Sequence, residues 1–188
     1  THMAGIHLLD PQTGDYNTSY LGRYLSGVNW KLLTLVKRQQ GLIIKPGNPL
    51  NIQGLTDLTR PGVRFVNRQK GSGTRVLLDY LLARENLQPD NIYGYSHEEY
   101  THLAVAAAVQ NDSCDVGMGV YASARVLGLD FIPLVEEDYE LCILPGIMRP
   151  EHEECLIDTI KSPEFIERVT SLGGYNMEGS GIIRLSSN

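Results

Sequence analysis

Residues 64–75 read RFVNRQKGSGTR and place a strand, a glycine turn and the start of a helix in immediate succession. The alternation of side chains over 63–67 predicts the strand. A helix is expected from Thr74 to about Asn86, because four leucines between positions 77 and 82 fall on one helical face. A strand that leads through a glycine turn into a helix is typical of an α/β sheet with crossover helices.

The same stretch is unusually basic. Between Leu58 and Leu78 there is no carboxylate, and five basic residues occur there, namely Arg60, Arg64, Arg68, Lys70 and Arg75. The first turn of a helix leaves N–H groups unpaired, and glycines let an anion approach them closely. The loop before Thr74 is therefore predicted to hold an oxyanion. The alternative, that Ser72 or Thr74 only caps the helix beneath a solvated basic face, stays open.

Two better-known phosphate loops do not match this stretch. A Walker loop needs lysine directly after its last glycine, but Gly73 is followed by Thr74 and Arg75. The dinucleotide fingerprint needs a third glycine where Val76 stands. Neither ATP nor NAD binding is supported.

Two further segments offer donors. Residues 96–99 match a capping box, which predicts a helix that begins there and runs to about Gln110, with Thr101 in its first turns. Gly117–Tyr121 is predicted as a strand end that opens into a helix, where the Tyr121 hydroxyl could close over a ligand. A capped surface helix and a buried strand without ligand are the alternatives for these two segments.

The remaining elements alternate along the chain, with an acidic loop expected at 136–138. Further strands are predicted over 4–9, 30–36, 41–44, 115–120, 131–134 and 139–144. Further helices are predicted over 121–127, 150–161 and 163–172, and a single helical turn or two over 52–58; 16–27 is either a short helix or irregular. Ser162 caps the 163–172 helix, Pro163 opens it and Gly173 ends it.

Composition excludes several classes of protein. The chain has 188 residues, 16 Lys and Arg against 22 Asp and Glu, and a net charge of −6, which argues against nucleic-acid binding. It has no apolar run near the roughly 18–20 residues of a membrane span. Positions 1–3 look like a cloning remnant rather than a signal peptide.

Catalytic and metal chemistry find little support. The three cysteines, Cys114, Cys142 and Cys155, suit neither a disulfide framework nor a CxxC metal pair, so a reducing, cytoplasmic location is expected. The five histidines are scattered without metal-ligand spacing. A Cys114–His102 pair has no geometric warrant, and Ser72 lacks the GxSxG context of a nucleophile elbow. We expect no catalysis by this chain and no cofactor.

Several motifs together carry a resemblance to a known family. They are Gly5–Asp10, Arg38–Leu42, Gly47–Pro49, Arg64–Tyr80, Glu98–Ala108 and Leu172–Tyr175. With these motifs the chain resembles the periplasmic-binding-protein-like (PBP-like) domain found fused to helix-turn-helix regulators and to molybdopterin-biosynthesis proteins, and is similar to molybdate- and tungstate-binding proteins.

The resemblance implies a class II periplasmic-binding-protein fold of two α/β lobes joined by crossing segments near Lys45 and 135–139. Lobe 1 would comprise 4–45 and 135–188, and lobe 2 would comprise 46–134 with the anion-binding loop. The family pattern usually begins some tens of residues earlier. Lobe 1 is therefore expected to be incomplete at its N-terminal end.

The resemblance and the loop chemistry together define the expected site. Its ligand-binding residues are Arg68, Gly71, Ser72, Gly73, Thr74, Arg75, Thr101 and Tyr121. The loop offers hydroxyl and amide donors and no carboxylate acceptor, which favours molybdate or tungstate over hydrogen phosphate, provided that Glu98 and Glu99 do not turn inward.

The expected function is a ligand-sensing domain of a transcriptional regulator. The alternatives are a domain of a molybdenum-insertion protein and an effector domain for a small organic anion. Its expected partners are a small oxyanion and a fused helix-turn-helix or molybdopterin-biosynthesis domain. We expect the domain itself to contact neither nucleic acid nor membrane. Whether it forms a homodimer is left open.

Overall fold

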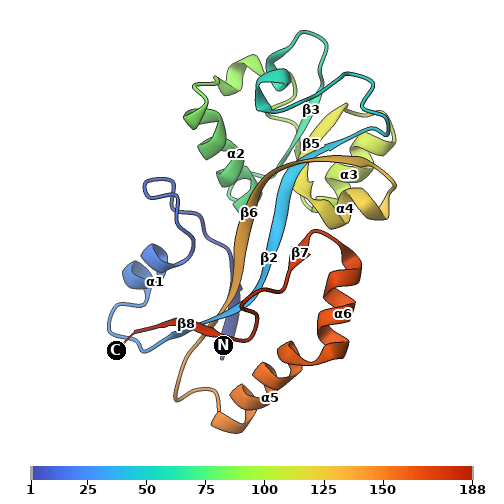
Figure 1. The fold of residues 1–188 in the computed structure, drawn as a ribbon. Coiled ribbons are helices and arrows are strands. Elements are labelled where there is room, and N and C mark those ends of the chain that lie inside the picture. Colours follow the sequence, from blue (N-terminus) through green and yellow to red (C-terminus); the bar gives the residue numbers. More distant parts are fainter. Residues whose placement is uncertain (1, 188) are drawn as a thin grey trace. The chain divides into compact units, whose positions relative to one another are not determined.

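The computed structural model describes residues 2–187, which form two compact units. Unit 1 holds 2–38 and 137–187, and unit 2 holds Gln39–Glu136. Two long strands, β2 (Lys31–Ile44) and β6 (Asp130–Ile143), each run from one unit into the other (Figure 1). Positions 1 and 188, which belong to the expected remnant 1–3 and to lobe 1, lie outside the described residues.

Unit 2 is built around parallel strands. Its strands besides β2 and β6 are β3 (Phe65–Arg68), β4 (Glu98–Glu99) and β5 (Val116–Val120). Strand β3 pairs in parallel with both β4 and β5, and β5 pairs antiparallel with β2. Parallel strands end at the same edge of a sheet, so the chain leaves all three at one edge of unit 2.

A helix follows each of these three strands. They are α2 (Gly73–Arg84), α3 (His102–Gln110) and α4 (Tyr121–Val126). In Figure 1, α2 lies to one side of β3 and β5, and α3 and α4 lie to the other. Two short 3₁₀ helices complete the unit, η1 (Leu55–Thr59) and η2 (Pro89–Asn91). Helices α2, α3 and α4 therefore begin beside the ends of these strands.

The core of unit 2 forces helix α3 close onto strand β5. Val66, Val105 and Ile43 are fully buried in it. A Cβ added at Gly117 would lie 2.3 Å from Val105 Cγ1, and one at Gly119 would lie 2.9 Å from Ile43 Cδ1. Glycine at 117 therefore lets α3 pack closely on β5, whereas at 119 the atom met is the flexible end of Ile43, which can move aside more easily.

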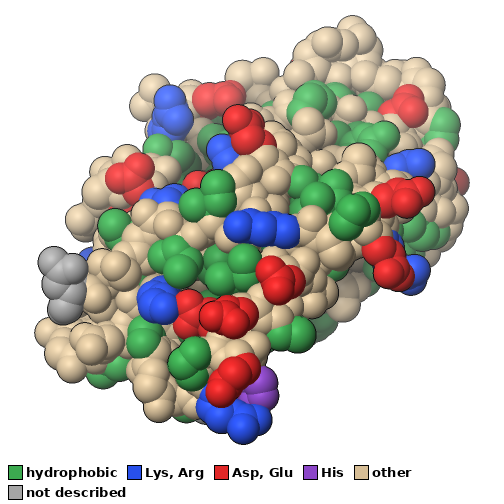
Figure 2. All heavy atoms as spheres, turned by 60° about the horizontal axis from the view of Figure 1, so that its bottom comes forward, with side chains coloured by type: hydrophobic (Ala, Val, Ile, Leu, Met, Phe, Trp, Pro, Cys, Tyr) green, Lys and Arg blue, Asp and Glu red, His purple; other side chains and the backbone are tan. Residues whose placement is uncertain are grey.

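In unit 1, three short strands pair with β2 and β6. Strand β1 (Met3–Ile6) pairs antiparallel with β6, and β7 (Tyr175–Asn176) and β8 (Ile183–Ser186) pair antiparallel with β2. Its helices are α1 (Thr18–Tyr24), α5 (Pro150–Lys161) and α6 (Pro163–Leu172). Figure 2 turns the α5 end forward and shows acidic and basic side chains interspersed with hydrophobic ones on that face.

One buried ion pair ties unit 1 together. Glu140 is 1% exposed and accepts hydrogen bonds from Arg184 Nε at 2.6 Å and Arg184 Nη2 at 2.8 Å. Asn17 Nδ2 donates to the same carboxylate at 2.8 Å. Because a buried carboxylate must be paired, these contacts join β6, β8 and the chain just before α1.

Helices α5 and α6 are confirmed at their predicted bounds, and the open choice at 16–27 is decided in favour of a short helix, α1, whereas several strand predictions were wrong. Strands β2 and β6 are continuous and not interrupted at 37–40 and 135–138. Glu137 is buried in β6, so 136–138 is not a solvated loop. The capping box at 96–99 does not open a helix, because Glu98–Glu99 pairs with β3 and α3 begins at His102. Within residues 2–187, no helix has the length and apolar character to cross a bilayer.

Candidate functional site

The start of α2 is a capped glycine turn. Ser72 is the N-cap, and its Oγ accepts from the Arg75 N–H at 3.2 Å. Gly71 has φ +87°, a left-handed conformation that favours glycine. The simple capping role considered for Ser72 is therefore confirmed. Capping uses the oxygen as an acceptor, so the hydroxyl can still donate to a ligand.

Thr74 has a partner that the sequence did not indicate. Its side chain is buried, and its Oγ1 lies 3.0 Å from Gln40 Nε2 and 3.3 Å from Gln40 Oε1. Gln40 is itself 0% exposed and comes from β2. The contact fixes the first turn of α2 against β2 and adds an amide group to the candidate site.

Arg68 holds two loops together. It is 8% exposed, and its Nη2 donates to the Tyr100 carbonyl at 3.0 Å while its Nε lies 3.3 Å from the Glu99 carbonyl. Nε also lies 3.1 Å from Gln69 Oε1. The guanidinium thus joins the end of β3 to the segment that leads into α3.

Arg75 is already paired with neighbouring side chains. Its Nε lies 3.2 Å from Asp79 Oδ1 and its Nη1 lies 3.4 Å from Glu98 Oε1. The guanidinium also stacks over the Tyr95 ring, 4.0 Å from the centroid. A direct contact from Arg75 to an anion would have to compete with these two carboxylates.

Glu98 turns toward the loop, which bears on the choice of anion. Its Oε1 accepts from the Lys70 N–H at 3.2 Å as well as facing Arg75. The expectation of a loop surrounded by donors only is therefore wrong at the Lys70 end. At the Thr74 end the described partner is Gln40, which offers both a donor and an acceptor.

The start of α3 is capped in the same way as α2. Thr101 is the N-cap, and its Oγ1 accepts from the Ala104 N–H at 2.9 Å. The next residue, His102, packs against β5, since a Cβ added at Gly119 would lie 3.4 Å from His102 Nδ1. Thr101 itself is exposed.

Tyr121 opens α4 and is half-buried. Its ring meets that of Phe131 edge-on, with the centroids 5.3 Å apart and an interplanar angle of 86°. This packing fixes the ring beside the end of β5.

Contacts among the predicted site residues place them at one edge of unit 2. Arg68 links the α2 loop to the α3 start, Thr74 contacts Gln40, and Gln40 pairs with Val120, the residue before Tyr121. A role for these residues in ligand binding remains a prediction. Gln40 was missed because its partner Thr74 lies 34 positions away, and a single glutamine in a strand gives no local signal of that contact.

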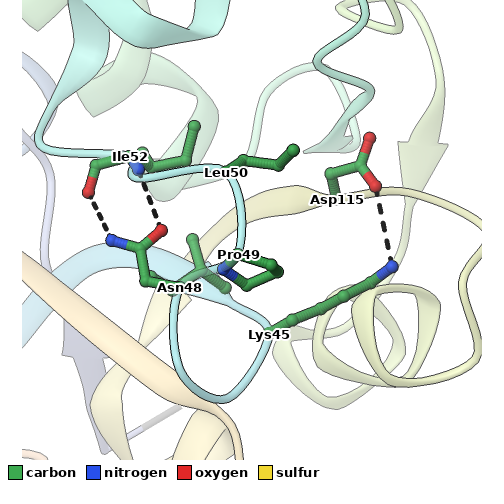
Figure 3. Close-up of a pocket in the computed structure, with 7 residues that line it drawn as sticks. Lys45, Asn48, Pro49, Leu50, Ile52 and Asp115 are labelled. Carbon is green, nitrogen blue, oxygen red and sulfur yellow. Dashed lines mark hydrogen bonds and ion pairs between the residues drawn. The ribbon is translucent and has the colours of Figure 1, made fainter.

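A separate pocket lies at the opposite end of β5 (Figure 3). It has a volume of about 260 Å³, and its lining includes Lys45, Asn48 and Asp115. Strand β5 starts beside this pocket, because Ile44 pairs with Val116, and ends beside Gln40. None of the predicted site residues lines it.

The charged groups of this pocket are paired. Lys45 Nζ contacts Asp112 and lies 3.7 Å from Asp115 Oδ1, and Arg64 Nη2 lies 2.8 Å from Asp115 Oδ1. The hydrogen bond from Arg64 lowers the pKa of Asp115, and the hydrogen bond to Asp112 raises the pKa of Lys45. Across residues 2–187, no three His, Cys, Asp or Glu side chains gather as a metal site.

The sequence is similar to two curated relatives. It is 35% identical over 189 residues to the uncharacterized protein YvgK of Bacillus subtilis, covering 98% of this chain. The chain spans 59% of the length of that relative. It is also 37% identical over 109 residues to a protein encoded in the region 5′ of a 2Fe-2S ferredoxin gene of Clostridium pasteurianum, covering 57% of this chain and 96% of that one.

Three solved structures share the fold. A phosphate transporter substrate-binding protein from Clostridium perfringens with bound phosphate has a TM-score of 0.62 at 13% identity, covering 94% of this chain and 79% of that one. The CcmR regulatory domain of Synechocystis in complex with 2-PG has a TM-score of 0.59 at 13% identity, covering 85% of this chain and 71% of that one. The substrate-binding domain of a molybdenum ABC transporter from Clostridium difficile has a TM-score of 0.57 at 17% identity, covering 78% of this chain and 66% of that one.

The family is shown by the sequence itself. The sequence model described as the PBP superfamily domain matches residues 1–161, and the α/β fold agrees with that of the solved binding proteins. The expected family is thus confirmed, and the chain belongs to the periplasmic-binding-protein-like (PBP) superfamily.

Proposed function

We propose that this domain is a non-catalytic sensor for a tetrahedral oxyanion, with molybdate or tungstate preferred, and that the anion sits on the first turn of α2. One observation carries the proposal: the turn Gly71–Gly73 leads into α2 at the edge where β3, β4 and β5 end. Ligands of open α/β sheets bind at the carboxyl ends of the strands, and helix N-termini favour anions.

The donor set of this turn is well defined. The N–H groups of Gly73 and Thr74 have no acceptor inside α2, because they belong to its first turn. The hydroxyls of Ser72 and Thr74 lie at the same turn. Such a set suits an anion that carries no proton, because every ligand oxygen can then accept.

Glu98 weakens the preference for molybdate or tungstate. Its Oε1 accepts from the Lys70 N–H and from the Arg75 guanidinium, and a carboxylate at this end of the loop can also accept from a protonated anion. Hydrogen phosphate would need such an acceptor for its proton. The Gln40 amide beside Thr74 is a second group that could supply one, so phosphate is the anion to compare first.

The regulatory part of the proposal draws support from the likeness to the CcmR regulatory domain in complex with 2-PG. In this role the domain would be cytoplasmic and fused to a helix-turn-helix region, and it would make no nucleic-acid contact of its own. That same likeness supports a second candidate, an effector domain for a small organic anion. A domain of a molybdenum-insertion protein would use the same oxyanion site.

Calorimetry on matched variants tests the proposal. Molybdate, tungstate, sulfate, phosphate and 2-phosphoglycolate would each be titrated into the wild type, Thr74→Val and Thr59→Val. Thr59 is the control because its hydroxyl donates to the Thr56 carbonyl at 2.8 Å, away from α2. Loss of one hydrogen bond to a charged ligand costs about 1–3 kcal/mol, so Thr74→Val should weaken molybdate binding by about 5- to 150-fold.

Two outcomes would overturn the proposal. One is molybdate affinity that is unchanged in Thr74→Val while Thr59→Val also binds normally. The other is 2-phosphoglycolate binding that is tighter than molybdate and equally sensitive to Thr74→Val, which would establish the organic-anion candidate instead.

A further inference from the structure

Unit 1 contains a pocket of its own, between strands β2 and β6 and helix α6. Its volume is about 260 Å³, and aliphatic and aromatic side chains such as Phe165, Val169 and Tyr175 line most of it. Pockets for drug-sized ligands begin at about 300 Å³, so this one suits a small molecule. Arg38 and Tyr139 supply its polar groups.

Arg38 brings a cation to the apolar pocket. Its side chain is 12% exposed, its Nε donates to Glu137 Oε1, and its guanidinium stacks over the Tyr139 ring at 4.8 Å from the centroid. These contacts fix the plane of the guanidinium. The cation is thus held in one orientation among apolar neighbours.

One nitrogen of this guanidinium lacks a partner. Arg38 Nη2 is buried and has no hydrogen-bond partner among the described residues. A buried donor without an acceptor is costly, and native structures rarely leave one unsatisfied. Because this nitrogen is closed to water, a ligand oxygen can satisfy it once a neighbouring side chain of the pocket wall moves aside.

The surroundings set the charge of that ligand. Glu137 is 1% exposed, and its second oxygen lies 3.7 Å from His7 Nδ1, so the carboxylate faces two nitrogen-bearing side chains. His7 also stacks on Tyr139, with the ring centroids 5.3 Å apart. A ligand carboxylate on Arg38 Nη2 would share the guanidinium with Glu137, which accepts from Nε.

We propose that this pocket binds a small amphipathic carboxylic acid, with its carboxylate on Arg38 Nη2 and its apolar body against Phe165 and Val169. All of these residues belong to unit 1, whereas the oxyanion turn belongs to unit 2. The proposal therefore stands independently of the proposed function.

The test uses hexanoate as the probe and calorimetry on the full chain. Val169→Trp fills the pocket and leaves Arg38 and Glu137 in place, and Thr170→Trp puts the same bulk on the next residue of α6, which is exposed and does not line the pocket. We expect at least a tenfold loss of hexanoate affinity in Val169→Trp and no change in Thr170→Trp. Hexanol and hexanamide should bind at least tenfold more weakly than hexanoate to the wild type.

A second variant covers the case in which Val169→Trp does not fold. Arg38→Lys keeps a cation beside Glu137 but removes Nη2, and we expect the same tenfold loss. Thr74→Val should leave hexanoate binding unchanged, which separates this site from the oxyanion turn. The proposal is overturned if the wild type does not bind hexanoate, if hexanamide binds equally well, or if the pocket variants that fold bind like the wild type.

Discussion

Replacing Gly117 by alanine should destabilise the protein through helix α3. The new Cβ would lie 2.3 Å from Val105 Cγ1 and 3.0 Å from Val66 Cγ1. Carbon atoms in contact are normally about 3.5–4.0 Å apart, so α3 must move by about 1 Å or Val105 must leave its rotamer. Such overpacking costs about 1–3 kcal/mol, and the lower chain entropy of alanine offsets about 0.5–1 kcal/mol of it. Taking the middle of each range, the net loss of unfolding free energy should be about 1 kcal/mol.

Urea unfolding followed by circular dichroism measures this loss. Gly22→Ala is the matched control, because no atom lies within 4 Å of its added Cβ and it sits inside α1, where alanine gains about 0.5–1 kcal/mol. Val105→Ala should partly rescue Gly117→Ala, so that the double variant loses at least about 0.5 kcal/mol less than the sum of the single variants. A Gly117→Ala protein as stable as the wild type would refute the close packing of α3 on β5.

Two further predictions follow from the pKa shifts. The pKa of Asp115 is lowered by its hydrogen bond from Arg64, so this pair stabilises the fold above the ordinary aspartate pKa of about 4 and the contribution disappears as the pH falls through the folded pKa. Asp115→Asn should therefore lower stability at pH 7 and flatten the acid limb of a stability–pH curve; an unchanged curve would contradict this. Among the thiols, burial raises the pKa of Cys114 to about 12 and also raises that of Cys142, whereas Cys155 is exposed. Native protein at pH 8 should react with DTNB quickly at Cys155 alone and at all three thiols in urea, and rapid native labelling of Cys114 would count against its burial.

Helices α5 and α6 could be predicted because their end signals are local. Pro150 and Pro163 open α5 and α6, Ser162 Oγ accepts from the Phe165 N–H at 3.2 Å, and Gly173 ends α6 at φ +78°. Each signal acts within about four residues of the helix end, so the sequence alone contains it.

The long strands were misjudged because their continuity depends on distant partners. Polar residues 37–40 suggested a break in β2, but Lys37 and Arg38 pair with Asn176 and Tyr175 of β7. The acidic residues 136–138 suggested a loop, but Glu137 is buried beside Arg38. A polar side chain in a strand becomes predictable only when its partner is known.

The start of α3 shows two local signals in competition. Ser96 and Glu99 match a capping box, and Thr101 is an equally good N-cap. The structure resolves the conflict because Glu98–Glu99 pairs with β3 in parallel, which leaves only Thr101 to cap the helix. The candidate site was similarly incomplete, since the loop and its donors could be read locally while the contacts of Gln40 and Glu98 could not.

Titration of molybdate into isotopically labelled protein, followed through the backbone amide signals, tests the central claim most directly. Binding on the first turn of α2 predicts that the largest shifts occur at Gly71–Arg75 and are lost in Thr74→Val. Molybdate that binds while these amides stay unshifted, with the changes confined to other segments, would contradict the account.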